Sequence, residues 1–232
     1  MKSFENFLVP PKKETLSANI AAQLKNIILK QKLKKGDKLP TERALAENLQ
    51  VSRVVIKQSL LSLEQSGFIE IKPGPKGGSF VKKDFTKPIK IFFQDINLNN
   101  DVSIDDFKEL RNILESAVAR SAAGKASPAD VEILTAINES FIEEKNKQLH
   151  GEINNKFHLE IAKIAGNPII TNLLKSLLEL FFYYPGTSVS SSFLKVAYQD
   201  HIELIEALAQ HDPDRAEKKI YKNIVRQNGR VK

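Results

Sequence analysis

A short run of side chains around position 53 has the chemistry to read the edges of DNA base pairs. At about 100° of rotation per residue, Arg53, Val54 and Lys57 in RVVIKQSLLSLEQ fall on one side of a helix. A guanidinium can bond to guanine edges in a major groove, and a branched apolar group can contact a thymine methyl. The alternative is an amphipathic helix whose basic side faces only water, and this segment alone does not decide between the two.

Two short helices joined by a tight turn would position this face. Thr41 and Ser52 each precede a helical pattern, and each can accept a backbone N–H that the first helical turn leaves unpaired. Leu45 and Leu49, four residues apart, share one face of the first helix. The segment PTERALAENLQVSRVVIKQSLLSLEQSG therefore predicts a helix, a turn and a second helix that begins after Ser52.

A β-hairpin is predicted directly after the second helix. Residues 68–72 partly alternate between apolar and charged side chains, PGPKGG supplies turn residues, and residues 79–82 form a second strand. At the turn Lys76 precedes Gly77, and a glycine backbone can approach a phosphate closely. The order helix, helix, hairpin favours a DNA-binding wing over an unrelated surface hairpin.

Charge is distributed unevenly along the 232 residues, whose formal net charge is +7. Residues 1–90 carry 18 Lys and Arg against 8 Asp and Glu, whereas residues 91–232 carry 17 against 20. A basic excess confined to the predicted DNA-reading part is what phosphate binding requires. The sequence lacks cysteine, the apolar core of a signal peptide and an apolar stretch long enough to span a bilayer. We therefore expect a soluble cytoplasmic protein with no membrane partner.

The DNA-reading elements resemble a known family. The run GDKLPTERALA, the Val-Ser-Arg turn and the glycine-rich wing resemble the winged helix-turn-helix of GntR-family bacterial transcriptional regulators over residues ~16–83. The sequence departs from the family at Val54-Val55, where Thr-Pro is usual, and at Lys57, where Arg is usual, so the operator sequence stays open. The predicted DNA-contacting residues are Arg43, Ser52, Arg53, Val54, Lys57, Lys76 and Gly77.

Everything after residue 102 is predicted to be helical, because caps and breakers such as Ser103 and Pro128 separate amphipathic segments. The predicted fold class is mainly α: an N-terminal winged helix-turn-helix of three helices plus a β-hairpin, and a C-terminal all-α antiparallel bundle of six to seven helices. The predicted parts are a flexible arm at 1–15, the winged domain at 16–84, a linker at 85–102 and the helical domain at 103–232.

The helical half resembles the FCD effector-binding domain of the FadR subgroup of GntR regulators. The resemblance covers residues ~103–228 and rests on ELRNILESAVARSAA, NNKFHLEIAKIAGNPII and QDHIELIEALAQHDPDRAEKKI. Members often hold a divalent metal through one Asp and three His, and the matching positions here are Asn154, His158, His201 and Asn223. The resemblance thus implies a Zn, Ni or Mn site on His158, His201 and Asn154. Because two ligands are neutral amides, we expect weak binding unless water or the effector completes the site.

Arg111 and Glu115 stand four residues apart at the start of this domain, so they can form an ordinary ion pair. The resemblance implies instead that Arg111 reaches into the cavity and binds an effector carboxylate, which a guanidinium fork suits. The effector would be a small organic acid, with an acyl-CoA or another metabolite bound without metal as the alternative. The predicted effector-binding residues are Arg111, Asn154, His158, His201 and Asn223. His150 and His211 match nothing in the family, and we expect both to be exposed.

Together these features predict a ligand-responsive DNA-binding regulator, usually a repressor in this family, that binds a palindromic operator as a homodimer. A first rival hypothesis is a metabolite-processing enzyme, but no set of nucleophile, base and acid is visible in the sequence. A second rival is a non-specific DNA-binding protein in which the helical half serves only for dimerisation.

Overall fold

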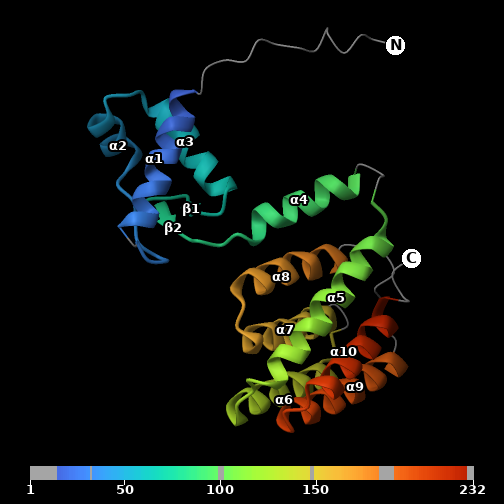
Figure 1. Ribbon diagram of the computed structural model, residues 1–232. Helices are drawn as coiled ribbons and strands as arrows, with labels where there is room; N and C mark the ends of the chain where they lie inside the picture. The colour runs from blue at the N-terminus through green and yellow to red at the C-terminus, as the bar shows by residue number, and fades with distance from the viewer. Residues whose placement is uncertain (1–14, 32, 99–101, 147–148, 183–190, 229–232) are drawn as a thin grey trace, which may run out of the picture. The chain divides into compact units, whose positions relative to one another are not determined.

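A computed structural model of the chain describes residues 15–31, 33–98, 102–146, 149–182 and 191–228 (Figure 1). The arm predicted at 1–15 therefore lies almost wholly outside the described residues. The chain divides into two compact units, which we call unit 1 (Met1–Pro88) and unit 2 (Ile89–Lys232).

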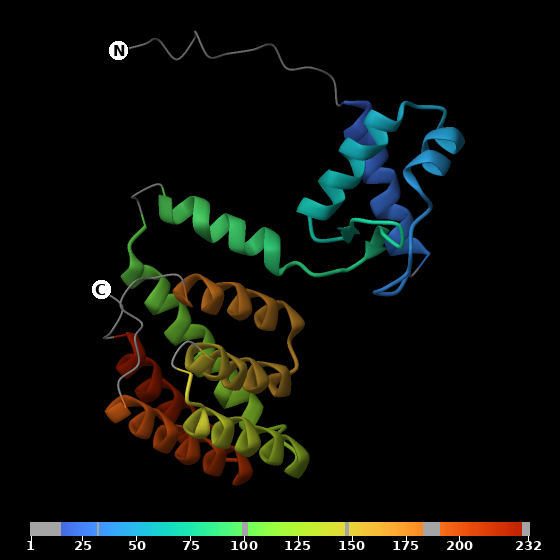
Figure 2. The same cartoon turned by 180° about the vertical axis from the view of Figure 1, so that it is seen from behind.

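The described residues of unit 1 form three helices and a β-hairpin, which can be followed in Figures 1 and 2. The helices are α1 (Leu16–Lys30), α2 (Glu42–Leu49) and α3 (Arg53–Gln65), and the hairpin pairs β1 (Ile69–Lys72) antiparallel with β2 (Gly78–Val81). Thr41 caps α2 and Ser52 caps α3, as their positions in the sequence predict. Between these helices Gln50 takes a left-handed conformation at φ 52°, which turns the chain directly into α3. The predicted winged helix-turn-helix is confirmed.

The apolar face of α3 packs against α1. Ile56 and Leu60 are almost fully buried in the same core as Ile28 of α1. Ser59 Oγ also donates a hydrogen bond to the carbonyl oxygen of Ser17, at 2.8 Å, which ties the two helices together. Burying an apolar side chain such as that of Ile56 or Leu60 stabilises the fold by about 1.5–3 kcal/mol. The rotation of α3 about its axis is thereby fixed, and its opposite face points to solvent.

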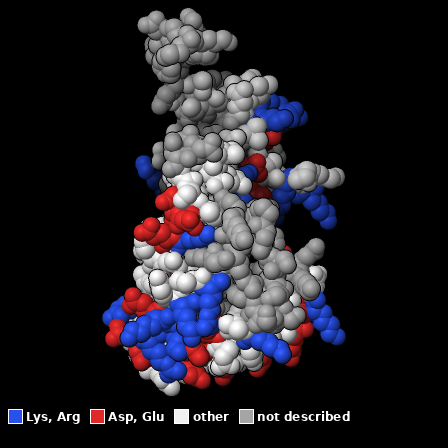
Figure 3. Space-filling view, turned by 90° about the vertical axis from the view of Figure 1, so that its right-hand side faces the viewer, with Lys and Arg blue, Asp and Glu red and all other residues white. Residues whose placement is uncertain are grey.

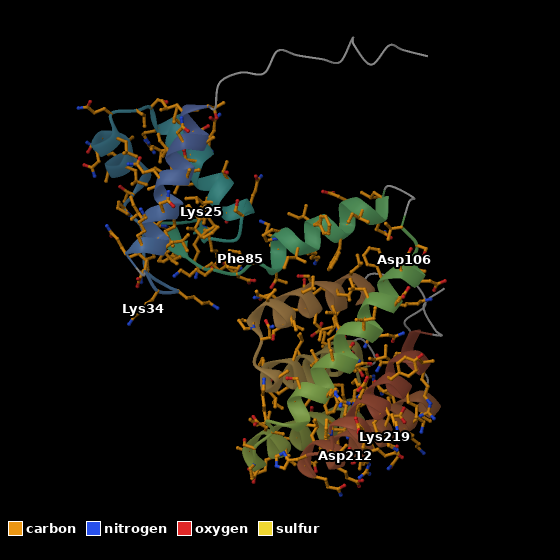
Figure 4. The ribbon with its side chains drawn as sticks, viewed as in Figure 1. Lys25, Lys34, Phe85, Asp106, Asp212 and Lys219 are labelled. Carbon is orange, nitrogen blue, oxygen red and sulfur yellow. The ribbon has the colours of Figure 1, made fainter. Side chains whose placement is uncertain are left out.

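Phe68 joins the start of the hairpin to α1. Its ring meets the ring of Phe85 edge-on, with 5.2 Å between centroids, and Lys25 Nζ lies 4.7 Å from its centroid. Lys25 and Phe85 accordingly lie near each other in Figure 4. The hairpin is thus anchored on the helices at its base, while its turn extends away from this contact.

Every element of secondary structure described in unit 2 is a helix, as predicted. Its helices are α4 (Thr86–Leu98, which begins at the end of unit 1), α5 (Ile104–Ala123), α6 (Pro128–Glu143), α7 (Leu149–Ala165), α8 (Pro168–Phe182), α9 (Ser191–Ala209) and α10 (Pro213–Asn228). α10 runs beside α5 and α9, and α7 packs against α5, α6 and α8 (Figures 1 and 2). The described helices include none that is long and apolar enough to cross a membrane.

Local signals set where α5 and α6 begin. Ser103 and Asp106 form a capping box at the start of α5, where Figure 4 labels Asp106. Ser127 and Asp130 repeat the arrangement at α6, with Pro128 in the first turn. Hydrogen bonds from the side chain and backbone of Ser103 lower the pKa of Asp106 because they stabilise its carboxylate. Such caps are worth about 1 kcal/mol each.

The segment predicted as a linker at 85–102 is mostly helical, which corrects our expectation of irregular structure. Pro88 falls in the first turn of α4, where its missing N–H would have no helical partner, so it does not break the helix. Phe93 is 4% exposed and packs edge-on against Phe107 of α5, with 5.7 Å between ring centroids. The apolar residues of this segment are therefore explained by a helix that packs on unit 2.

We predict that Ile56→Ala destabilises the protein by about 2–5 kcal/mol, because it opens a cavity between α3 and α1. The matched control is Leu61→Ala on the same helix, which removes a side chain from the exposed face. Urea unfolding of the full chain, followed by circular dichroism, measures both. Equal loss of stability in the two variants would contradict the described orientation of α3.

Candidate functional site

The solvent-facing side of α3 carries the residues predicted to read DNA. The side chain of Arg53 is 70% exposed, Val54 is 66% exposed, and Lys57 is also exposed. Arg53 Nη2 lies 3.9 Å from Glu42 Oε2 of α2, a distance too long for a hydrogen bond. The guanidinium at the start of α3 is therefore free to engage a new partner.

Ser52 and Arg43 flank this face. Ser52 Oγ accepts the N–H of Val55 as the cap of α3, at 3.4 Å. Arg43 on α2 is exposed and donates to Glu47 Oε1 at 2.8 Å, one helical turn further on. An exposed pair of this kind contributes about 0.3–0.5 kcal/mol, so a phosphate can replace Glu47 at little cost.

The wing presents a basic tip on a backbone that only glycine fits. Lys76 is exposed at the turn. A Cβ added at Gly77 would lie 2.1 Å from the carbonyl oxygen of Lys72, inside any possible contact distance. The predicted tip residues thus sit on a tight, side-chain-free turn that can approach a duplex closely.

Two basic residues beside the hairpin were missed by sequence reasoning: Lys72, which ends β1 next to the turn, and Lys38, which bridges to Phe80 of β2. Lys38 Nζ and Lys72 Nζ each lie 5.3 Å from the centroid of the Phe80 ring. Lys34, labelled in Figure 4, extends from the loop that precedes Lys38. The positive charge of the loop KLKKGDK was visible in the sequence. The loop lies near the wing because Lys38 bridges to Phe80, a contact that the sequence does not reveal.

Basic side chains of unit 2 are arranged differently. Figure 3 shows a group of them intermingled with acidic side chains on the face that carries α10. Arg226 Nη1 lies 2.5 Å from Asp200 Oδ1 of α9, and Lys219 Nζ, whose residue is labelled in Figure 4, lies 2.5 Å from Glu203 Oε2. These cations are paired with acids of α9. The basic surface that suits nucleic acid is therefore the one on α3 and the wing in unit 1.

A second constellation is buried inside unit 2, where polar side chains from four helices meet among apolar ones. Its members, which we call the polar cluster, are Arg111 and Glu115 of α5, Asn154 and His158 of α7, His201 of α9, and Asn223 and Gln227 of α10. All of these except Asn154 and Gln227 are buried, with at most 5% of the residue exposed. Buried polar groups at this density are costly unless they bond to one another or to a ligand.

Glu115 is the anion of the polar cluster. Arg111 Nε donates to its Oε1 at 2.5 Å, and His158 Nδ1 contacts its Oε2. Burial raises the pKa of Glu115, but the charges of His158 and Arg111 and their hydrogen bonds lower it more, so it falls from 4.5 to about 2. Glu115 is therefore ionised at neutral pH and balances the charge of Arg111.

Gln227 links the remaining members. Its Oε1 accepts from Arg111 Nη2 at 2.7 Å and from Asn154 Nδ2 at 3.4 Å. Its Nε2 donates to Asn223 Oδ1 at 2.7 Å, and lies 3.3 Å from Asn154 Oδ1 and 3.3 Å from His158 Nε2, so its second hydrogen faces these two atoms. One primary amide in the last turn of α10 thus connects α5, α7 and α10.

His201 lies beside this network. Its ring stacks on Phe157 with 3.9 Å between centroids, and is 5.7 Å from the ring of His158. Its Nδ1 pairs with Asn138 Oδ1 at 2.9 Å. Burial and the neighbouring His158 lower the pKa of His201 well below 6.5, so the ring is neutral at pH 7. Among the described residues nothing bonds to His201 Nε2 or Asn223 Nδ2, although both atoms are buried.

Comparison with known proteins supports both halves of this description. A family model described as FCD domain matches residues 106–225, more than half of the chain. A second model, described as bacterial regulatory proteins of the gntR family, matches residues 16–81. The chain belongs to the GntR family and carries an FCD domain. Its members are transcriptional regulators, not enzymes.

Relatives of this GntR-family regulator extend over nearly its whole length. The HTH-type transcriptional repressor NanR of Enterobacter sp. (strain 638) is 27% identical over 227 residues, which cover 93% of this chain and 85% of that protein. NanR of Escherichia coli (strain K12) is 25% identical over the same share of this chain. The solved structure of Streptococcus agalactiae GntR has a TM-score of 0.73 at 22% identity, and covers 92% of this chain and 99% of that one. At this level of identity, the likeness to the Streptococcus agalactiae structure shows a shared fold.

The five effector residues predicted for this regulator lie close to one another. Arg111, Asn154, His158 and Asn223 all contact Gln227, and the ring of His201 adjoins that of His158. Sequence reasoning missed three partners, Glu115 as the anchor of His158, Asn138 as the partner of His201, and Gln227. The i, i+4 spacing of Arg111 to Glu115 and of Asn223 to Gln227 was visible, but neither pattern shows which side chains are buried.

The prediction that His150 is exposed is wrong, because its residue is 2% exposed and its Nε2 pairs with the carbonyl oxygen of Glu144 at 2.9 Å. Its ring packs edge-on against Phe141 of α6, a contact between neighbouring helices that the sequence does not reveal. His211 is exposed, as expected, with Nδ1 2.8 Å from the carbonyl oxygen of Ala123.

We predict a distinctive acid sensitivity from Glu115. Its pKa is lowered by folding from 4.5 to about 2, so it stabilises the native state fully above about pH 4.5, and this contribution is lost as the pH falls toward 2. Glu115→Gln should be less stable at pH 7, because Arg111 loses its counter-charge, and should depend less on pH in that window. Urea unfolding between pH 7 and pH 2 measures both; parallel curves for the two proteins would contradict the assignment.

Proposed function

We propose that this GntR-family regulator is a repressor that binds a palindromic operator as a homodimer and responds to a small organic acid bound at the polar cluster. The observation that carries the DNA-binding part is the outward basic face of α3 beside a glycine-built wing. Each subunit then places α3 in one major groove, with the wing on the adjacent backbone. Operator DNA is in the bacterial cytoplasm, so this is where the protein acts.

Symmetry relates the two halves of the proposal. A homodimer with a two-fold axis presents two identical helices, which match two inverted half-sites about one helical turn apart. In such a dimer the two winged units can adopt more than one spacing. An effector bound to unit 2 changes the operator affinity by no more than the ratio of its own affinities for these arrangements. The NanR relatives are named as repressors. For a repressor, we expect the effector to weaken operator binding and release the DNA.

The polar cluster supports an acid as effector through the contacts that are available. Arg111 already gives its Nε to Glu115, but its Nη2 reaches only the amide of Gln227, and a carboxylate oxygen can take that place. Asn223 Nδ2 offers a second donor, and His201 Nε2 offers an acceptor. A small molecule that combines a carboxylate with a hydroxyl group satisfies all three.

The large surface cavity of unit 2 is not this site. It has a volume of about 470 Å³ and is lined by Ser116, Asp214, Glu217, Lys218 and Tyr221 on α5 and α10. Its acids and bases are solvated, and Arg120 pairs with Asp214 and Glu217 beside it. The buried cluster, with orphaned polar atoms and a compensated charge, has the properties expected of a specific ligand site.

We predict that Arg53→Ala reduces operator affinity to that for random duplex, because each lost guanidinium contact costs about 1–3 kcal/mol per half-site. Lys163→Ala, an exposed cation of unit 2, removes the same charge elsewhere and is the matched control. Gel-shift titration against specific and random duplexes at fixed salt measures the ratio of affinities. Retained specificity in Arg53→Ala would contradict the groove assignment.

We also predict that Asn223→Ala raises the effector concentration needed for half-release of DNA by about tenfold, the loss expected for one buried hydrogen bond. A panel of small hydroxy acids is first screened by thermal shift, and active compounds are then titrated into the operator complex. Lys218→Ala, on the outer side of α10, is the control and should respond like the unmodified chain. An equal response of Asn223→Ala would remove the effector from the polar cluster.

A further inference from the structure

Gln227 holds the position in the polar cluster where several donors and acceptors converge. It contacts Arg111, Asn154, His158 and Asn223, four side chains from three helices. Three of these are among the predicted effector residues that the family resemblance placed around a metal. An amide with two donor hydrogens and two acceptor lone pairs can serve all of them at once.

The imidazoles are oriented so that their Nε2 atoms are available to a ligand. His158 Nδ1 is held by Glu115, and His201 Nδ1 by Asn138. A partner on the far nitrogen is the usual support of a metal-binding histidine, so ring orientation alone would allow an ion. However, Gln227 Nε2 lies 3.3 Å from His158 Nε2 and stands where an ion bound to that nitrogen would have to lie.

The charges around this point do not suit a divalent ion. Glu115 already balances Arg111 and is bonded through both oxygens. Asn154, Asn223 and Gln227 are neutral, and no three His, Cys, Asp or Glu side chains converge as a ligand group within the described parts of the chain. Zinc and its neighbours prefer His, Cys and carboxylate, and a buried dication without anionic ligands is strongly disfavoured. The residues present therefore do not fit the metal that the family resemblance implies.

We propose that the amide of Gln227 takes the place of a metal ion in this FCD domain, so that the effector is recognised directly by side chains and enters by displacing Gln227. This rests on the proposed function, in which the polar cluster is the effector site. The displaced amide specifies the ligand: an oxygen acceptor for Arg111 Nη2 and Asn154 Nδ2, and a hydrogen-bond donor for Asn223 Oδ1, next to a polar group that faces His158 Nε2. A carboxylic acid with a neighbouring hydroxyl or amide group has both.

The proposal is tested with metal alone. The full chain is stripped with a chelator, dialysed and titrated calorimetrically with Zn²⁺, Ni²⁺ or Mn²⁺ chloride. We expect that no ion binds to the unmodified chain in a way that depends on His201. Ions that bind equally well to the unmodified chain and to His201→Asn occupy sites outside the polar cluster, and this result supports the proposal. One ion per chain in the unmodified protein, lost in His201→Asn, would overturn it.

A second pair of variants isolates Gln227. Asn154→Asp with Asn223→His restores the ligand types of the family, and adding Gln227→Ala to that double variant should raise its metal affinity by at least about tenfold. Gln227→Met is a control for the loss of the amide with the side-chain length kept, and should act like Gln227→Ala. Equal metal affinity with and without Gln227 would overturn the proposal.

Failure of this proposal is separable from failure of the proposed function. Release of operator DNA by a small acid is measured after chelator treatment and again with metal added back. Release in the chelated protein supports direct recognition. Release that occurs only after metal is restored would leave the regulator function intact and refute the role of Gln227.

Discussion

The ionised carboxylate of Glu115 is the contact on which the interior of unit 2 depends. It sits between Arg111 of its own helix and His158 of α7, so a single side chain fixes α5 against α7 and sets the orientation of an imidazole. Burial opposes its charge, yet the two neighbouring donors lower its pKa to about 2. Removing Arg111 would leave the carboxylate of Glu115 without its counter-charge in an apolar interior, which is strongly destabilising.

From this anchor the polar network extends to the end of α10. Gln227 joins Arg111 to Asn154, His158 and Asn223, so the last turn of α10 is held by hydrogen bonds rather than by apolar packing alone. Hydrogen bonds between neutral amides are individually worth about 1 kcal/mol and exchange readily with those of a ligand. One amide side chain thus ties the last turn of α10 to α5 and α7.

Much of this fold follows from local sequence signals, and the interior of the site does not. Thr41, Ser52, Ser103 and Ser127 precede helical patterns and cap helices in the structure, because a cap is decided within four residues. Pro88 predicts a break from the sequence but lies in the first turn of α4, because a proline is compatible with either a helix end or a helix start, and the packing of Phe93 on α5 favours the start.

The interior pairs lie beyond such reasoning. His201 meets Asn138 across 63 residues, and Arg111 meets Gln227 across 116. No spacing rule links residues so far apart, and the family resemblance identified five positions of this cluster without showing which side chains lie between them. The exposed DNA-reading face was easier to predict, since one helix and its buried stripe determine it.

The two unpartnered atoms, His201 Nε2 and Asn223 Nδ2, have a consequence for the lifetime of the protein in a cell. Each is shut away from water without a hydrogen bond from any described residue, and each such group costs about 1–3 kcal/mol. A small molecule that satisfies them stabilises the native chain by mass action and reduces the fraction open to proteases. Under the proposed function, in which the effector binds at these atoms, the steady-state abundance of the chain rises with the effector concentration, so the amount of protein and its DNA affinity both respond to the effector.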